Sequence, residues 1–406
     1  IESSGGDLTL NLHDNVTIGA NIASESGGGV RLQGGKYQAR LNAVSPKLFI
    51  ARNQATNKYG GGVEIIGRAT ASIGSTGIAG LGTVVLNRAA YGGGIAVIGG
   101  ADSGQNALLN LFSTDANIPV RVASNTASHT GGGIYLKPDI VGLSAATYAI
   151  ANLWDFQISE NVAENGTAIY ADAFDGLYWG LQGGFAGTVY VTFNGPRLEP
   201  ASVACSLSAS CNVITGNVAQ SDKGNRTEGS TIVMQEWAHL YADRVRLDKN
   251  VAAHAVLGFG AELQLSNCLI ADNNLSRYAV VRNEAGLKAP SSAISTDWFY
   301  SKLPVTIKGC TLANNLIANN EPNTFIIDVA SHGPVELFGN VFAQPSVNTR
   351  TMRSAFATPT ATYNLSREIG TLNNGVGNLV GAPAFIDAAA GDYRLKLNSK
   401  VRSLGI

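Results

Sequence analysis

Residues 122–136, Val-Ala-Ser-Asn-Thr-Ala-Ser-His-Thr-Gly-Gly-Gly-Ile-Tyr-Leu, contain the unit that decides the fold. Asn125 stands three positions after an aliphatic residue and two positions before an alanine. The glycine triplet Gly131–Gly133 then opens a short run in which inward and outward positions alternate. Alternation at period two is typical of a β-strand and differs from the 3.6-residue period of a helix.

The unit recurs along the chain, and repeats are read first because they specify a whole architecture. The nine asparagines are Asn21, Asn53, Asn87, Asn125, Asn161, Asn217, Asn250, Asn273 and Asn315. An aliphatic residue stands three positions before every one of them, and alanine stands two positions after most of them. Glycine triplets also open strands at 27–29, 60–62 and 92–94.

These repeats predict an all-β solenoid. Steps of 32 to 38 residues separate the first five asparagines, and no helical periodicity fills the intervals. A coil of three short strands takes about 22 residues, so the surplus must be loop. We predict one domain of about ten to twelve coils. We place a cap region over residues 1–20, repeat coils over 21–345 and a closing segment over 346–406.

The corner asparagine has two physical roles in this prediction. Asparagine tolerates a left-handed backbone conformation, so we expect it to turn the chain at the corner. Stacked asparagine amides also hydrogen-bond to one another in ladders. We therefore expect Asn125 and Asn161 to be buried and hydrogen-bonded to neighbouring coils.

The unit resembles a known family of repeats. Asn-x-Ala followed by Gly-Gly-Gly-Ile, best seen at 122–127 and 131–134, is similar to repeats of bacterial-surface β-helix proteins. These are polymorphic outer-membrane proteins and autotransporter passengers, within the pectin-lyase-like superfamily. The stretch 377–395 resembles the closing segment of such secreted proteins. The resemblance implies a single-stranded right-handed parallel β-helix and a secreted or cell-surface location, but it does not imply one activity.

A second register concerns the cysteines. Paired aliphatic residues precede an inward position in Leu207-x-Ala209 before Asn212, Leu263-x-Leu265 before Cys268, Val305-x-Ile307 before Cys310, and Val335-x-Leu337 before Asn340. Cys268 and Cys310 are thus expected at one position of consecutive coils, about 5 Å apart. A disulfide and two stacked thiols both fit that spacing. Cys205 and Cys211 have the separation to close a small loop.

Composition excludes several classes of protein. The 406 residues include 48 glycines and are 45% hydrophobic but only 14% charged, with a net charge of -1. Low charge with ample apolar content argues against disorder. A net charge near zero argues against nucleic-acid binding, which needs an excess of positive charge. No apolar run approaches the length of a transmembrane helix, so we expect no transmembrane segment in this chain. The first residues lack a signal-peptide pattern, so we expect that a leader is absent or already removed.

No pattern of metal or cofactor chemistry is evident. The five histidines are scattered, and the four cysteines lack the C-x-x-C spacing of zinc or redox sites. We therefore predict no metal site and no cofactor.

Aromatic residues in long loops are the ligand-binding candidates. The predicted loops, which we expect to leave the solenoid at one corner, span 137–150, 172–206 and 283–304. The aromatic candidates are Tyr178, Trp179, Trp298 and Tyr300 in two of these loops and Trp237 beside a strand between them. Exposed rings beside a groove form a saccharide-binding arrangement. The alternative is that they pack the loops onto the coils.

Charged candidates for catalysis are few and weak. They lie in one segment and are Asp243, Arg246, Asp248 and Lys249. A lyase would use a base beside a neutralising group, whereas the alternative for such a run is a solvated face. The outward row after the glycine turns, Arg31, Glu64, Ala96, Tyr135 and Tyr170, lacks the acidic cluster of a calcium-dependent lyase. Paired aspartates typical of polygalacturonase-like hydrolases are also missing.

The functional prediction is a secreted or cell-surface structural or adhesive module. Its partner would be an extracellular polysaccharide or a host cell-surface glycan, bound on a face flanked by loops. We expect Trp237 and the segment 243–249 to floor that cleft. The alternative is a polysaccharide lyase or glycosidase acting in the same groove, and the question of enzymatic activity stays open with non-catalytic binding favoured.

Overall fold

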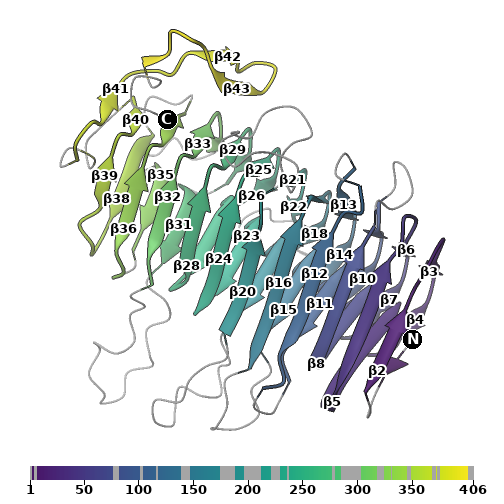
Figure 1. Ribbon diagram of the computed structural model, residues 1–406. Helices are drawn as coiled ribbons and strands as arrows, with labels where there is room; N and C mark the ends of the chain where they lie inside the picture. Colours follow the sequence, from purple (N-terminus) through teal and green to yellow (C-terminus); the bar gives the residue numbers. More distant parts are fainter. Residues whose placement is uncertain are drawn as a thin grey trace, which may run out of the picture.

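The protein is described by a computed structural model of 406 residues. It describes residues 2–3, 7–75, 82–100, 104–115, 118–138, 147–173, 188–195, 212–220, 229–235, 237–276, 279–284, 303–317, 324–330, 332–344, 349–367, 372 and 375–400. Three parallel sheets run along the described chain, with 20, 12 and 9 strands. Figure 1 shows their strands stacked side by side from the N-terminal to the C-terminal end. The predicted all-β parallel β-helix is confirmed.

The largest sheet has two parts, which we call A1 and A2, because each coil contributes two strands to it. A1 follows the glycine turn and contains β1 (Glu2–Ser3), the first part of β5 (Val30–Val44), the first part of β8 (Val63–Gly74), β11 (Ile95–Ile98), β15 (Ile134–Lys137), β19 (Ile169–Asp172), β23 (Ile232–Gln235), β27 (Val256–Phe259), β31 (Ala279–Glu284), β35 (Phe325–Val329) and β38 (Arg350–Ser354).

A2 follows A1 within each coil, and β5 and β8 bend from A1 into A2. It contains β2 (Leu8–Asn11), the second parts of β5 and β8, β12 (Ala107–Phe112), β16 (Tyr148–Trp154), β20 (Thr188–Phe193), β24 (Ala238–Asp243), β28 (Glu262–Ser266), β32 (Val305–Lys308), β36 (Val335–Phe338) and β39 (Thr360–Thr362).

Sheets B and C complete each coil. Sheet B contains β3 (Thr17–Gly19), β6 (Phe49–Ala51), β9 (Val84–Val85), β13 (Val120–Ala123), β17 (Phe156–Ser159), β21 (Asn212–Thr215), β25 (Val245–Asp248), β29 (Leu269–Ala271), β33 (Thr311–Ala313), β37 (Val341–Ala343), β40 (Leu365–Ser366) and β41 (Leu379–Val380). Sheet C contains β4 (Ile22–Ala23), β7 (Gln54–Ala55), β10 (Arg88–Tyr91), β14 (Thr126–Thr130), β18 (Val162–Ala163), β22 (Val218–Ala219), β26 (Val251–Ala252), β30 (Asn274–Leu275) and β34 (Leu316–Ile317). Sheet B takes one strand from each coil, so its 12 strands agree with the expected number of coils.

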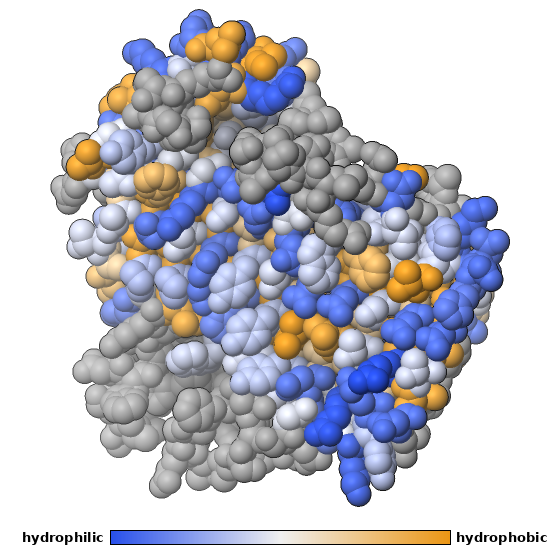
Figure 2. Space-filling view, in the orientation of Figure 1, coloured by the Kyte–Doolittle hydropathy of each residue, from blue (hydrophilic) through white to orange (hydrophobic). Residues whose placement is uncertain are grey.

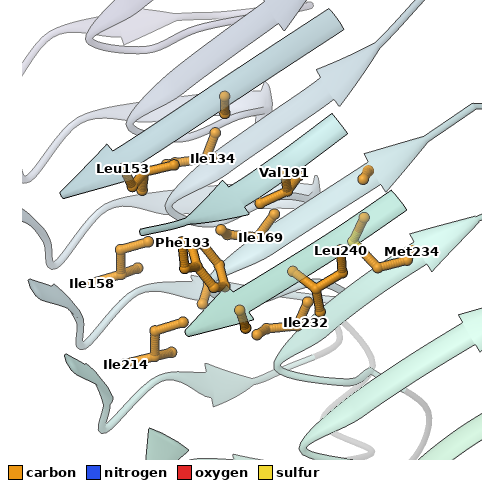
Figure 3. Packing of buried hydrophobic residues seen from close by; sticks show 14 of the residues in the cluster. Ile134, Leu153, Ile158, Ile169, Val191, Phe193, Ile214, Ile232, Met234 and Leu240 are labelled. Atoms are coloured by element: carbon orange, nitrogen blue, oxygen red, sulfur yellow. The ribbon is translucent and has the colours of Figure 1, made fainter. Parts of the chain in front are cut away.

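One continuous apolar core fills the solenoid. Figure 3 shows Ile134 and Ile169 from A1, Val191 and Phe193 from A2 and Ile158 from sheet B pointing toward one another. The middle strands of A2 alternate between buried and half-buried residues, as in β12, β16 and β20. Inward residues therefore hold the coils together, while outward residues are free to carry other chemistry.

The asparagines form the predicted ladder between sheets B and C. Each side-chain amide donates to Oδ1 of the next asparagine at 2.8–3.0 Å, from Asn21 through to Asn315. The amides of Asn125 and Asn161 also donate to the carbonyls of Val84 and Val122 at 2.9 and 3.0 Å. Both asparagines are fully buried, so the expectation for these two residues is confirmed.

The expected backbone conformation of these asparagines was wrong. The left-handed residue is the one before each asparagine, as with Ser124 at φ 53° and Glu160 at φ 57°. The asparagine side chain must point inward to meet the ladder on both sides. The chain therefore turns one residue earlier, where the side chain lies at the surface, as Glu160 does.

Glycine is required where the chain enters A1. Gly131 has φ +71°, and a Cβ on Gly132 would lie 2.6 Å from the carbonyl oxygen of Thr167 in the next coil. Side chains at these positions would thus collide with neighbouring backbone or strain the turn. The triplet permits close stacking of consecutive coils, and the strands after it begin where expected.

A second ladder lies between A2 and sheet B. Its stacked positions are Phe156, Asn212, Val245, Cys268, Cys310, Asn340, Asn364 and Asn378. Cys268 and Cys310 are neighbours in consecutive coils, as predicted, and the backbone N–H of Cys268 donates to Cys310 Sγ at 3.3 Å. Both are buried free thiols, which settles the choice left open for this pair. Cys205 and Cys211 lie outside the described residues.

One part of the second register was assigned to the wrong segment. The A2 strand before Asn212 is β20, whose Val191 and Phe193 fill the inward positions that we gave to Leu207 and Ala209. The latter two residues lie outside the described residues. The interval 172–206 is therefore not one loop, because β20 divides it. The error arose because part of the surplus chain follows the strand instead of preceding it.

Candidate binding face on sheet A2

Of the five aromatic residues predicted to bind a ligand, the structure describes only Trp237. Trp237 lies directly before β24, has φ 58° and is 44% exposed. Tyr178, Trp179, Trp298 and Tyr300 lie outside the described residues. Trp237 thus presents a ring at the start of an A2 strand.

The predicted charged candidates are largely occupied with one another or with close neighbours. The guanidinium of Arg246 donates from Nε to Asp248 at 2.6 Å, and Asp248 is only 2% exposed. Asp243 accepts hydrogen bonds from Arg244 at 2.9 Å and from Asn267 at 3.1 Å. The oxygens of these carboxylates already accept hydrogen bonds from neighbouring side chains, so few of them are available to bind a ligand.

Of these charged residues, only Asp243 lies on the strand that Trp237 precedes, at an outward position. Trp237 stands at the start of β24 and Asp243 at its end, about 20 Å apart along the strand. Arg246 and Asp248 belong to β25, in sheet B, where Asp248 aligns with Ala271 of β29. Lys249 is exposed at the following corner with φ 54°. The structure therefore separates the residues that we expected to floor one cleft.

A different set of residues converges on the outer face of A2. The register of β20, β24 and β28 aligns Tyr190 with His239 and His239 with Glu262. The next outward row aligns Tyr241 with Gln264. Parallel strands place aligned side chains about 4.8 Å apart, so these side chains meet across three consecutive coils.

Glu262 is the centre of this group. Its Oε2 lies 2.6 Å from His239 Nδ1 and accepts a hydrogen bond from the Tyr241 hydroxyl at 3.1 Å. Its Oε1 accepts a hydrogen bond from the Gln264 amide at 2.5 Å. The side chain of Glu262 is 10% exposed and that of His239 is 15% exposed. A mostly buried carboxylate thus holds three neighbouring side chains in place.

Aromatic rings extend the group toward the preceding coil. The ring of His239 stacks on Tyr190, with centroids 4.7 Å apart and planes at 16°. Tyr190 contacts Tyr148 of the preceding coil, with centroids 6.0 Å apart. In Figure 2, side chains of intermediate hydropathy gather over the middle strands β16, β20 and β24. We call Tyr148, Tyr190, His239, Tyr241 and Glu262 the A2 aromatic face.

The electrostatics of the face keep Tyr190 and Tyr241 neutral. Burial, followed by the charge and hydrogen bond of Glu262, raises the pKa of Tyr241 to about 12. Burial, then Tyr148 and Glu262, also raises the pKa of Tyr190. Neutral phenols keep their hydroxyl protons at physiological pH, so both remain hydrogen-bond donors.

His239 has one ring nitrogen held by Glu262 and one that Glu262 does not engage. Nδ1 lies against Glu262, which favours a proton on Nδ1 and leaves Nε2 as an acceptor. Nε2 is not among the buried, unpartnered atoms of the described residues. The pair can therefore accept a hydrogen bond or a proton from a group lying on the face.

The outward row of A1 is different. Tyr135 and Tyr170 stack with centroids 5.9 Å apart and are 3% and 8% exposed. Burial raises the pKa of Tyr135 and Tyr170. Glu64 is 1% exposed and accepts a hydrogen bond from Arg31 at 2.8 Å. This row has the predicted alignment but is covered, so it presents little surface to a ligand.

No protein-family model, curated protein or solved structure matches the chain. No helix in the described part of the chain has the length and apolarity to cross a membrane. Among the same residues, no three His, Cys, Asp or Glu side chains gather as metal ligands would. The parallel β-helix therefore rests on the structure itself.

The sequence-based candidates included none of the five residues of the A2 aromatic face. Tyr190, His239 and Glu262 lie 49 and 23 residues apart along the chain, and only the strand register brings them together. The sequence pattern that could have located them is the β-strand alternation of inward and outward residues at 188–193 and 238–243. The first of these segments lies within the loop predicted over 172–206, so its outward residues are not aligned with those of other coils.

Proposed function

We propose that the protein is a secreted or cell-surface β-helix module that binds glycans on the A2 aromatic face. The observation that carries the proposal is the stacked pair Tyr190 and His239 beside the carboxylate of Glu262. Sugar rings present C–H faces to aromatic rings and hydroxyls to polar groups, and this face offers both within one area. The nearby exposed ring of Trp237 enlarges the apolar area.

The family relationship is part of the same proposal. A parallel β-helix with asparagine ladders and Gly-Gly-Gly turns supports kinship with bacterial-surface proteins of the pectin-lyase-like superfamily. Such proteins work outside the cell, which agrees with an extracellular glycan as the partner. The fold alone leaves the ligand open, because one fold hosts many functions.

A glycan array with the purified protein tests the binding proposal. We expect saturable binding to at least one polysaccharide class, and a loss of at least about tenfold in affinity for Tyr190→Ala combined with His239→Ala. Phe338→Ala is the matched control, since Phe338 is a 44% exposed aromatic on the same sheet several coils away. Equal loss in both proteins, or no glycan binding by folded wild type, would contradict the proposal.

The loop aromatics are tested separately. The sequence-based prediction is that Trp179→Ala with Trp298→Ala abolishes glycan binding while the thermal unfolding curve stays unchanged. If that pair of substitutions leaves affinity intact and the Tyr190 and His239 pair removes it, the binding surface consists of A2 residues alone.

A polysaccharide lyase or glycosidase is the second candidate, favoured by the pairing of His239 with Glu262. A histidine whose Nδ1 is held by a carboxylate is oriented to act as a proton acceptor at Nε2. The assay is the release of new reducing ends or unsaturated uronates from the bound polysaccharide. Release by wild type that His239→Ala eliminates would establish catalysis, whereas binding without release would leave an adhesive module.

A further inference from the structure

A cavity of about 320 Å³ lies between sheet B and the C-terminal hairpin β42 (Phe385–Asp387) and β43 (Asp392–Leu395). Its lining includes Gln344, Arg367, Pro383, Phe385, Ala389 and Tyr393. The volume falls at the lower end of small-molecule sites, which span about 300–1,000 Å³. The cavity is remote from the A2 aromatic face, because it lies outside sheet B.

The walls of the cavity are anchored on two sides. Tyr393 is 6% exposed, packs against Leu269, Ala271 and Ala313, and its hydroxyl donates to Asp272 at 2.6 Å. Phe385 meets the Tyr393 ring edge-on at 5.1 Å and also contacts the cluster of Val341 and Leu365. The hairpin therefore stands on fixed contacts, and the space beneath it is part of the packed structure.

Two polar residues form part of the lining of this mostly apolar space. Gln344 Oε1 accepts a hydrogen bond from the Asn315 N–H at 2.9 Å, which ends the asparagine ladder and fixes the amide. Gln344 Nε2 is buried and lacks a hydrogen-bond partner among the described residues. Arg367 is exposed at the edge of the cavity and forms no ion pair with any described residue. Both groups are donors, and one carries a positive charge.

We propose that this cavity binds a small carboxylate with an apolar body. Ala343, Pro383 and Phe385 would contact the apolar body, while Arg367 would pair with the carboxylate through its planar guanidinium. Gln344 Nε2 would donate to an oxygen of the ligand that reaches the cavity floor. The carboxylate of Asp272 accepts hydrogen bonds from both Tyr393 and Asn314 at Oδ1, so this oxygen is already engaged.

The test uses the whole chain and defined probes. Phenylacetate and hexanoate are titrated against the protein at low salt, with 2-phenylethanol and hexanol as uncharged counterparts, and binding is followed by saturation-transfer NMR. We expect saturable binding of at least one acid and at least about tenfold weaker binding of its alcohol. Absence of saturable binding for both acids, or equal binding of acid and alcohol, would overturn the proposal.

Variants locate the site. Arg367→Ala is expected to weaken acid binding at least about tenfold, and Gln344→Met to weaken it less because one neutral donor is lost. Arg40→Ala is the matched control, since it removes an arginine from the distant face of A2. Ala389→Trp fills the cavity and should eliminate binding with Arg367 intact. Unchanged affinity in both Arg367→Ala and Ala389→Trp, with the far-ultraviolet circular dichroism of wild type, would contradict this location.

Discussion

The asparagine corner and the A2 aromatic face are built by opposite rules. At the corner the same residue recurs in coil after coil, and Asn125, Asn161 and Asn217 make the same contacts at 3.0 Å. On the face each coil contributes a different side chain, such as Tyr190, His239 and Glu262. The same residue type must therefore recur at positions where each side chain hydrogen-bonds to its equivalent in the next coil. At outward positions, consecutive coils can carry different residue types.

The two regions also differ in burial, and this predicts different consequences of substitution. Asn161 is fully buried and bonds to coils on both sides, whereas the side chain of His239 remains 15% exposed. A change at the corner should lower stability, while a change on the face should chiefly alter binding. The four predictions that follow run from the largest expected effect to the smallest.

Asn161→Leu should cause the largest loss of stability. The substitution removes a side chain that donates to Asn217 and Val122 and accepts from Asn125, and it leaves several buried groups unsatisfied. We expect the free energy of unfolding to fall by about 3–6 kcal/mol, from about 1–3 kcal/mol per group. Urea unfolding measures this. Glu160→Ala, at the exposed position one residue earlier, is the control, and an equal loss there would refute the role of the ladder.

Glu262→Leu should have the next largest effect. Leucine leaves the donors of His239, Tyr241 and Gln264 without their common acceptor in a partly buried setting. The expected loss is about 1–3 kcal/mol in urea unfolding, with loss of glycan binding. Glu336→Leu on the same sheet removes an exposed carboxylate and should change stability by less than about 0.5 kcal/mol. Equal stability changes would show that Glu262 does not organise the face.

Tyr241 should titrate with a pKa of about 12 and return toward the ordinary value near 10 in Glu262→Gln. The pKa of Tyr241 is higher in the folded than in the unfolded protein, so the protonated hydroxyl contributes to the free energy of unfolding. This contribution is fully present below about pH 10 and is lost as the pH rises through about 12. Phenolate absorbance measures the pKa, with Tyr241→Phe variants in both backgrounds identifying the signal. An unchanged pKa in Glu262→Gln would assign the shift to burial alone.

Cys310→Asn should have the smallest effect, and it should be favourable. Cys310 stands in the second ladder, where its N–H already bonds to Asn340 Oδ1 at 2.9 Å and its sulfur lies 3.5 Å from the carbonyl of Leu265. An asparagine side chain at this position could donate to both oxygens and accept from the Cys268 N–H. We therefore expect the free energy of unfolding to rise by about 0.5–1.5 kcal/mol. Thermal unfolding tests this, with the bulkier Cys310→Leu expected to destabilise. Destabilisation by asparagine would show that the two corners follow different geometries.

The repeated unit was enough to predict the architecture. Aliphatic residues before each asparagine, glycine triplets and period-two strands report local requirements that recur in every coil, so they are readable without knowing which coils touch. The stacked cysteines followed from the same logic. The left-handed corner residue was misplaced by one position, because any residue type occupies it and the sequence carries no mark there.

The binding residues behave differently, for a physical reason. Tyr190, His239 and Glu262 come from separate coils, and insertions of varied length between coils hide which outward residues align. The same holds for the C-terminal cavity, which Arg367 and Tyr393 both line only because the hairpin folds back over sheet B. Periodic inward positions record the fold in the sequence itself, since every coil repeats the same contact. Contacts made once, between unlike side chains, arise from the register and packing of the folded chain.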